Sequence, residues 1–168
     1  KKTAAEKYPA IKSFDTYEAL LSDSTIELVI VNTPNYTHFD FAKQTLLAGK
    51  HIIVEKPFCV TVAECDELIS LEKEKNKLLS VYQNRRYDSD YKIIKKIIGE
   101  DWLGDIIEAE FHFDRYNPNL SPKQHKEVAS SGAGILKDLG PHLIDKPCFY
   151  LVSQKQFLLM FGLPERIL

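Results

Sequence analysis

The chain has 168 residues, of which 44% are hydrophobic and 27% are charged, and its formal net charge is −2. These values are ordinary for a soluble globular protein with a core of its own. The small net charge argues against nucleic acid or an anionic membrane surface as the main partner, and no apolar stretch is long enough for a membrane span. The three cysteines show no metal-ligand spacing. We therefore expect free thiols, no metal site and a cytoplasmic location.

Apolar runs and turn signals alternate through the first half of the chain. A helix is predicted to begin at Asp15, with Asp15 as N-cap and Glu18 in the capping-box position. Helical periodicity predicts helices at 38–48 and 61–77, and short apolar runs predict strands at 28–31, 52–54 and 78–82. This order implies a parallel sheet with right-handed crossovers, and therefore an α/β fold.

The second half of the chain has a different pattern. A helix is predicted at 88–98, ending at Gly99, and a strand with one solvent-facing side at 106–113. Residues 117–133 contain many polar residues with Pro, Gly and Ser, which predicts a long loop. Residues 135–145 are predicted to form a helix or a strand-to-helix turn. We expect a domain boundary near Tyr87.

Polar side chains follow the first two predicted strands. The segment Asn32–Asn35 follows the first, and Lys56 follows the second, with Glu55 placed to hold its ammonium group. The carboxyl ends of parallel strands meet at one sheet edge, where open α/β sheets bind ligands. Each feature also has an ordinary explanation, since Asn and Pro favour turns and surface lysines are common. Their combination favours a ligand site.

Further candidates lie after the third strand and near the end of the chain. Gln83–Arg86 supplies donors suited to a phosphate or a polyol, although a plain basic strand end is the alternative. Asp138 and His142 lie one helical turn apart, so that the carboxylate can fix the imidazole tautomer. With Lys56, they would form a proton-transfer set for an alcohol or carbonyl. Three glycines would let the backbone approach a ligand (132, 134 and 140). The remaining histidines have no such partner and are expected to be structural (His51, His112 and His125).

These residues resemble the Gfo/Idh/MocA family of NAD(P)-dependent sugar and polyol oxidoreductases. The resemblance runs from about Tyr8 to Asp145. It is carried by Thr33-Pro34-Asn35 with His38, by Ala48–His51, by Glu55-Lys56-Pro57, and by Asp138–Gly140 with His142 and Asp145. The segment Gln83–Asp90 is most similar to the branch that contains scyllo-inositol dehydrogenases.

The resemblance implies an architecture and its ligands. Residues 1–86 would form a partial Rossmann-type parallel sheet that lacks the first βαβ unit. Residues 87–146 would begin an α/β domain for substrate binding and oligomerisation. The cofactor would be NAD or NADP, the substrate a small sugar or inositol-like polyol, and the parent protein a homo-oligomer.

The resemblance also implies roles for single residues. Lys56 would bridge the substrate hydroxyl and the nicotinamide end of the cofactor, His142 would take the hydroxyl proton, and Asp138 would orient His142. Besides Lys56, the cofactor would be lined by Thr33, Pro34, Asn35, His38, Glu55, Asn84 and Arg85. Pro141 stands where relatives usually carry a small polar residue.

The chain departs from the family pattern in two places. It contains no G-x-G-x-x-G segment to seat a pyrophosphate on a helix N-terminus. An inactive fragment or pseudoenzyme, which binds dinucleotides poorly and acts through an intact relative, is therefore the alternative to an active dehydrogenase. Residues 147–168 lack the expected pattern, and Pro147 is expected to interrupt the helix before it. We expect these residues to be an out-of-frame tail.

Overall fold

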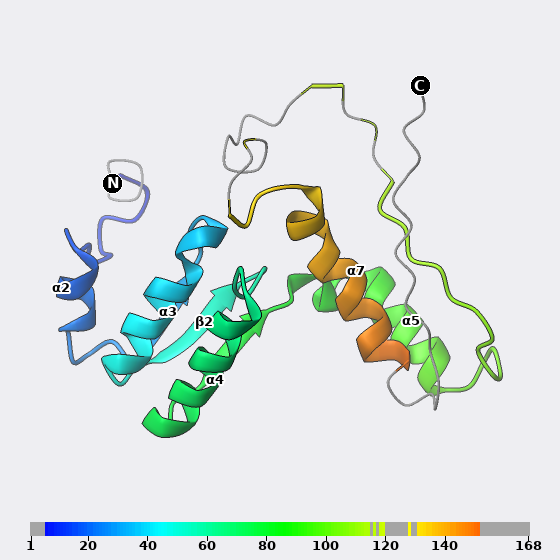
Figure 1. Cartoon of the computed structure of the whole chain (residues 1–168), viewed down its shortest axis with the longest axis horizontal. Coiled ribbons are helices and arrows are strands. Elements are labelled where there is room, and N and C mark those ends of the chain that lie inside the picture. Colours follow the sequence, from blue (N-terminus) through cyan, green and yellow to red (C-terminus); the bar gives the residue numbers. More distant parts are fainter. Residues whose placement is uncertain (1–5, 115, 117, 120–127, 129–130, 152–168) are drawn as a thin grey trace. The chain divides into compact units, whose positions relative to one another are not determined.

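The computed structural model describes residues 6–114, 116, 118–119, 128 and 131–151. The chain divides into two compact units (Figure 1). Unit 1 contains residues 1–82 and 121–138, and unit 2 contains residues 83–120 and 139–168. Residues 152–168 and most of the predicted loop at 117–133 lie outside the described residues.

Unit 1 is built on a three-stranded parallel sheet. Its strands are β1 (Leu28–Val31), β2 (His51–Glu55) and β3 (Leu79–Tyr82), in the order β1-β2-β3. Val31 pairs with Val54, which pairs with Val81, so the three strands are level near their carboxyl ends. The three predicted strands and the α/β fold are confirmed.

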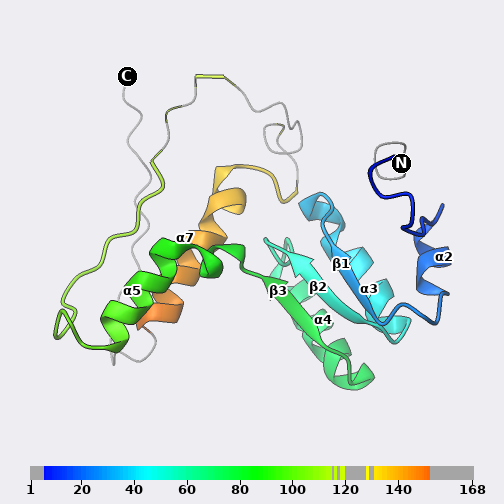
Figure 2. The same ribbon diagram turned by 180° about the vertical axis from the view of Figure 1, so that it is seen from behind.

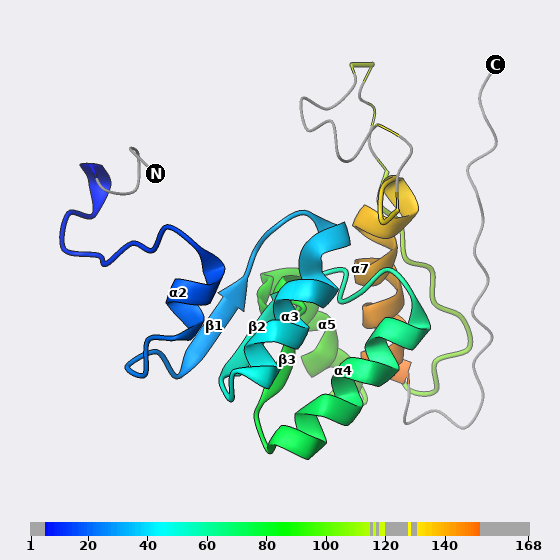
Figure 3. The same ribbon diagram turned by 60° about the vertical axis from the view of Figure 1, so that its left-hand side comes forward.

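Two helices cover one face of this sheet, as Figures 2 and 3 show. They are α3 (His38–Leu47), which follows the short 3-10 turn η1 (Asn35–Thr37), and α4 (Val62–Lys75). Alternate strand residues pack against the helices, and the buried core consists of Val29, Val31, Ala42, Leu46, Ile52, Val54 and Leu68. On the opposite face of β1, Leu28 is 43% exposed and Ile30 is 65% exposed.

The helix ends follow local hydrogen-bonding chemistry. Thr61 caps α4 by accepting a bond from the Glu64 amide at 3.3 Å, and the Glu64 carboxylate accepts one from the Thr61 amide at 3.0 Å. The short helix α2 (Tyr17–Leu21) is capped by Thr16, which accepts from the Ala19 amide at 3.1 Å. The prediction that Asp15 caps α2 was therefore wrong. The helix begins one residue later, which moves Glu18 out of the capping-box position.

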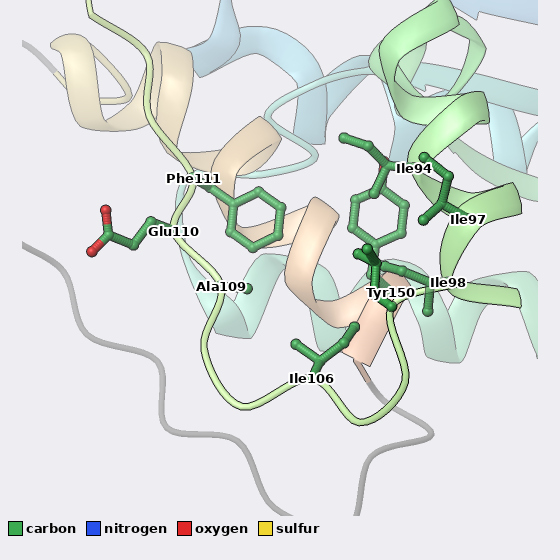
Figure 4. A pocket seen from close by; sticks show the side chains of 9 residues that line it. Ile94, Ile97, Ile98, Ile106, Ala109, Glu110, Phe111 and Tyr150 are labelled. Carbon is green, nitrogen blue, oxygen red and sulfur yellow. The ribbon is translucent and has the colours of Figure 1, made fainter. Parts of the chain in front are cut away.

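Unit 2 is assembled around two tyrosines. Tyr91 lies on α5 (Ser89–Gly99), which follows the turn η2 (Asn84–Tyr87), and Tyr150 lies on α7 (Ile135–Leu151). Their rings are 4.9 Å apart, and the Tyr150 hydroxyl donates to the Tyr91 carbonyl at 3.0 Å. Beside them is an apolar pocket of about 230 Å³, shown in Figure 4 and lined mainly by Ile94, Ile97, Ile98, Ile106, Phe111 and Tyr150.

Two predictions for the second half were wrong. Residues 106–113 are described but form no strand, and Ile107 is 93% exposed. Alternation alone does not make a strand, because a strand needs a neighbour to receive its backbone hydrogen bonds. Pro147 does not interrupt α7, which continues to Leu151. An interior proline costs about 3 kcal/mol, and in this helix Pro147 and Tyr150 are both buried.

The two helices expected in the second half are confirmed, and the expectation for its tail is not tested. Helix α5 confirms the helix predicted at 88–98, and α7 confirms the helical alternative for 135–145. The out-of-frame tail stays a prediction. None of the described helices combines the length and the apolar character that a membrane crossing requires.

We predict that Thr61→Ala lowers the free energy of unfolding by about 1 kcal/mol, because it removes the side-chain acceptor at the start of α4. Urea denaturation followed by circular dichroism measures the change. Ser70→Ala is the matched control, since the Ser70 hydroxyl bonds to a carbonyl within the same helix and caps nothing. Equal effects of the two substitutions would contradict the capping role.

We predict that Tyr150 makes the fold sensitive to alkali. Burial, followed by the nearby Tyr91, Asp90 and Asp145, raises the pKa of Tyr150 well above its usual range. A raised folded-state pKa gives stability that is complete below the unfolded tyrosine pKa of about 10 and is lost as pH rises above it. Tyr150→Phe should flatten this loss, and Tyr116→Phe should not, because Tyr116 is 92% exposed. Thermal unfolding across alkaline pH tests both.

Candidate active site

The loops that follow β1 and β2 leave the sheet at the same edge, because the strands are parallel and in register. The first loop carries Thr33, Pro34 and Asn35. Within it, the Thr33 and Thr37 hydroxyls are 2.6 Å apart, and the Thr37 hydroxyl donates to the Pro34 carbonyl at 2.7 Å. These bonds define the loop before α3 begins.

His38 connects the two loops from inside the core. Its side chain is only 1% exposed. One ring nitrogen, Nδ1, is 2.8 Å from the Pro57 carbonyl, and the other, Nε2, is 2.9 Å from the Thr33 carbonyl. Both ring nitrogens therefore face carbonyl oxygens of the loops that were predicted to line the cofactor, and a neutral imidazole, which carries one N–H, donates to one of these two carbonyls.

Lys56 pairs with a residue far along the chain. Its ammonium group donates to the Asp138 carbonyl at 2.6 Å and to the Asp138 carboxylate at 3.0 Å. The Lys56 side chain is 15% exposed and that of Asp138 is 29% exposed. Glu55 was expected to hold this ammonium, but its carboxylate instead accepts from the Lys56 backbone amide at 3.3 Å. A protonated lysine and a carboxylate thus meet at the sheet edge.

The segment that leads into α7 is attached to the same edge. The Asn35 side-chain amide donates to the Gly132 carbonyl at 2.8 Å, and the Lys137 ammonium lies 3.4 Å from the Val60 carbonyl. Gly132 was expected to approach a ligand closely. Its close neighbours among the described residues are Asn35, Tyr36 and Val60. The sequence marked this glycine as a position of close approach but did not show what it approaches.

His142 is in unit 2, where it is 5% exposed and its ring lies 6.2 Å from the Phe113 ring in an edge-on arrangement. On α7, Asp138 and His142 are one turn apart, as predicted. The orientation of His142 by Asp138 stays a prediction.

Asp145, one turn beyond His142, forms a two-pronged ion pair with Arg86 at 2.9 and 2.5 Å.

The residues that follow β3 carry buried polar atoms without a hydrogen-bond partner among the described residues. These atoms are Gln83 Oε1, Asn84 Oδ1 and Arg85 Nε. Another part of the Arg85 guanidinium bonds to Asp88 at 2.8 Å. Buried polar atoms are usually satisfied, so these three atoms are suited to a polar ligand or to water.

The other histidines differ from one another. His51 accepts a bond from the Leu78 amide at 2.9 Å, which agrees with the expected structural role. His112 was expected to have no carboxylate partner, but it lies 3.0 Å from Glu110 and 3.9 Å from Asp114. In an extended segment, residues two apart point to the same side, a signal that the sequence contained. The hydrogen bond that His112 donates to the Glu110 carboxylate raises the pKa of His112. His125 lies outside the described residues.

Metal ligands were not expected from the sequence. In the part of the chain that the structure describes, His, Cys, Asp and Glu side chains form no group of three or more that could hold a metal ion.

Comparisons with known proteins give two family matches. Residues 1–83 match the model of an oxidoreductase family with an NAD-binding Rossmann fold, GFO_IDH_MocA. Residues 91–154 match the corresponding C-terminal domain model, GFO/IDH/MocA C-terminal domain.

Three relatives illustrate the similarity. The chain is 37% identical to scyllo-inositol 2-dehydrogenase (NADP(+)) IolW of Bacillus subtilis, covering 95% of the chain and 42% of that protein. An NAD-binding protein from Listeria innocua has a similar structure, with a TM-score of 0.80 at 33% identity over 89% of this chain and 43% of that one. A levoglucosan dehydrogenase, solved with NADH and levoglucosan, has a TM-score of 0.72 at 28% identity. The match covers 89% of this chain and 41% of that one. The chain therefore spans about two fifths of the length of these relatives.

We predict that Asp138→Asn lowers the free energy of unfolding by about 1.5–3 kcal/mol, because it removes a charged partner from the partly buried Lys56 ammonium. The matched control is Glu67→Gln. It breaks the Lys43–Glu67 pair, whose side chains are 40% and 49% exposed, and should cost less than about 1 kcal/mol. Chemical denaturation measures both variants. Equal losses would show that the Lys56–Asp138 pair is only a surface contact.

Proposed function

Because the chain belongs to the Gfo/Idh/MocA family of oxidoreductases, we propose that the whole protein transfers hydride between NAD(P) and a secondary alcohol. The proposed substrate is a sugar or a cyclic polyol of the inositol type. The observation that carries this proposal is the Lys56–Asp138 ion pair at the carboxyl edge of the parallel sheet. Support for the substrate class comes from two relatives, one named for scyllo-inositol and one for levoglucosan.

The residues of this chain fit an NAD(P) cofactor. Thr33 and Pro34 follow β1, Glu55 ends β2 and Lys56 follows it, all at the edge where parallel α/β sheets bind nucleotides. After β3, Asn84 and Arg85 have buried polar atoms without a partner among the described residues, as a polar ligand requires. We propose that these residues hold the cofactor and that His38 supports their loops. Bound NAD(P) would supply the hydride acceptor.

We propose that three side chains of the protein manage the proton and the charge. Lys56 donates a hydrogen bond to the substrate hydroxyl oxygen and stabilises the negative charge that develops there. His142 accepts the hydroxyl proton on a ring nitrogen as the carbon–oxygen double bond forms. Asp138 accepts from the Lys56 ammonium and orients the His142 imidazole. Proton and charge are therefore handled by groups that need no metal ion.

The inactive-fragment alternative is not favoured by the comparisons, since the matched models and relatives are oxidoreductases. Fluorescence titration with NADH and with NADPH tests nucleotide binding by the chain itself. Poor binding is expected, because the chain has no glycine-rich pyrophosphate segment. Micromolar affinity would show that the loops after β1 and β2 hold the nucleotide without it.

We predict that, in the whole protein, His142→Ala and Lys56→Ala each lower turnover about 10²- to 10⁴-fold, the usual contribution of a positioned proton-transfer group. The assay follows reduction of NAD⁺ and NADP⁺ with scyllo-inositol, myo-inositol and a pyranose sugar as substrates. His112→Ala is the matched control and should keep normal turnover, because His112 is exposed and outside the proposed set. If the first two variants keep normal turnover, the role assignment is wrong.

A further inference from the structure

We propose that Asn35 is a positioning residue, which together with Gly132 fixes the start of α7 so that Asp138 lies against Lys56. The proposal departs from the expectation that Asn35 lines the cofactor. Its structural part concerns contacts within unit 1, and only its kinetic consequence rests on the proposed function.

The first contact is the hydrogen bond from Asn35. The Asn35 side-chain amide has one donor group, Nδ2, and it donates to the Gly132 carbonyl at 2.8 Å. Asn35 is itself fixed, because it begins the turn η1 immediately before α3. The bond therefore joins the loop after β1 to a segment 97 residues further along the chain.

The second feature is the fit around Gly132. Its φ is +80°, in the region that favours glycine. A Cβ at this position would lie 3.2 Å from Asn35 Cβ, 3.2 Å from Val60 Cγ2 and 3.7 Å from the Tyr36 amide nitrogen. A side chain would strain the backbone and crowd Asn35. Gly132 and Asn35 are thus matched in both shape and hydrogen bonding.

Five residues then connect Gly132 to Asp138, and the path between them is short and well defined. Gly134 accepts a hydrogen bond from the Asp138 amide at 3.0 Å, which closes the first turn of α7. Lys137 adds a contact to the Val60 carbonyl at 3.4 Å. A shift of Gly132 would therefore move Asp138, which holds Lys56 through both its carbonyl and its carboxylate.

Lysine acylation tests the proposal without any enzyme activity. The rate at which acetic anhydride labels Lys56 reports how often its amine leaves Asp138. Asn35→Ala removes the donor, and Asn35→Asp keeps the shape but places a carboxylate against a carbonyl. Each should raise the labelling rate of Lys56 about fivefold, the factor that corresponds to one lost hydrogen bond. Gly132→Ala should do the same from the other side of the contact.

Two comparisons make the result decisive. Asp138→Asn acts on Lys56 directly and should raise the labelling rate of Lys56. Lys43, which pairs with Glu67 between α3 and α4, should keep its labelling rate in every folded variant. If Asp138→Asn raises the Lys56 rate but all three substitutions at Asn35 and Gly132 leave it unchanged, the proposal is overturned. A variant that fails to fold raises the Lys43 rate as well and is replaced by another of the three.

The kinetic consequence is tested in the whole protein. Asn35→Ala should lower kcat about fivefold with a smaller change in the KM for the cofactor, because the substitution disturbs Lys56 and leaves the other proposed cofactor contacts intact. A raised cofactor KM with normal kcat would assign Asn35 to cofactor binding and overturn the positioning role. If the whole protein turns over no sugar or polyol, the proposed function fails, while the labelling result still decides the positioning role.

Discussion

The level pairing of three parallel strands is the constraint on which unit 1 depends. Val31, Val54 and Val81 are paired neighbours across the sheet, so the three strands end at the same level. The loops that follow them therefore begin at one edge of the sheet. Thr33 and Lys56 become neighbouring loop residues only through this pairing. A slip of one residue in β2 would turn the buried Ile52 and Val54 outward, and burial of these side chains opposes such a slip.

Polar contacts then fix the loops that the sheet has brought together. The buried His38 ring lies between the backbone carbonyls of both loops. Asn35 and Lys56 donate to the segment before α7 and within it. Such contacts contribute little net stability compared with well-packed apolar groups, because removing a charge or an amide from water costs about as much as the new bond returns. Removing one partner alone is costly, since it leaves the other partner partly buried without its bond. Their effect is to select one arrangement of Lys56. Hydrophobic burial holds the sheet together, and these polar groups determine how its edge is arranged.

The sequence was informative where a local pattern determines the structure. The β-branched run at 28–31 and the helix predicted at 61–77 are decided by neighbouring residues, and the structure confirms both. The pairing of Lys56 with Asp138 spans 82 positions, and no local pattern specifies it, so the adjacent Glu55 was the expected partner. The false strand at 106–113 has the same origin, because alternation describes the segment and not the neighbour it would need. Pro147 was misjudged because tertiary packing outweighed its local preference.

The outer side of β1, opposite the helices, has a consequence for how the chain behaves in solution. Parallel sheets are usually covered on both faces, yet among the described residues Leu28 keeps 43% and Ile30 65% of its surface exposed, opposite the face covered by α3 and α4. Burying a Leu or Ile side chain is worth about 1.5–3 kcal/mol, so contact between two such faces is favourable. Dilution removes this contact and concentration promotes it. Association of two chains also costs translational and rotational freedom, so these two side chains support only weak, reversible self-association of the chain on its own, which increases with its concentration.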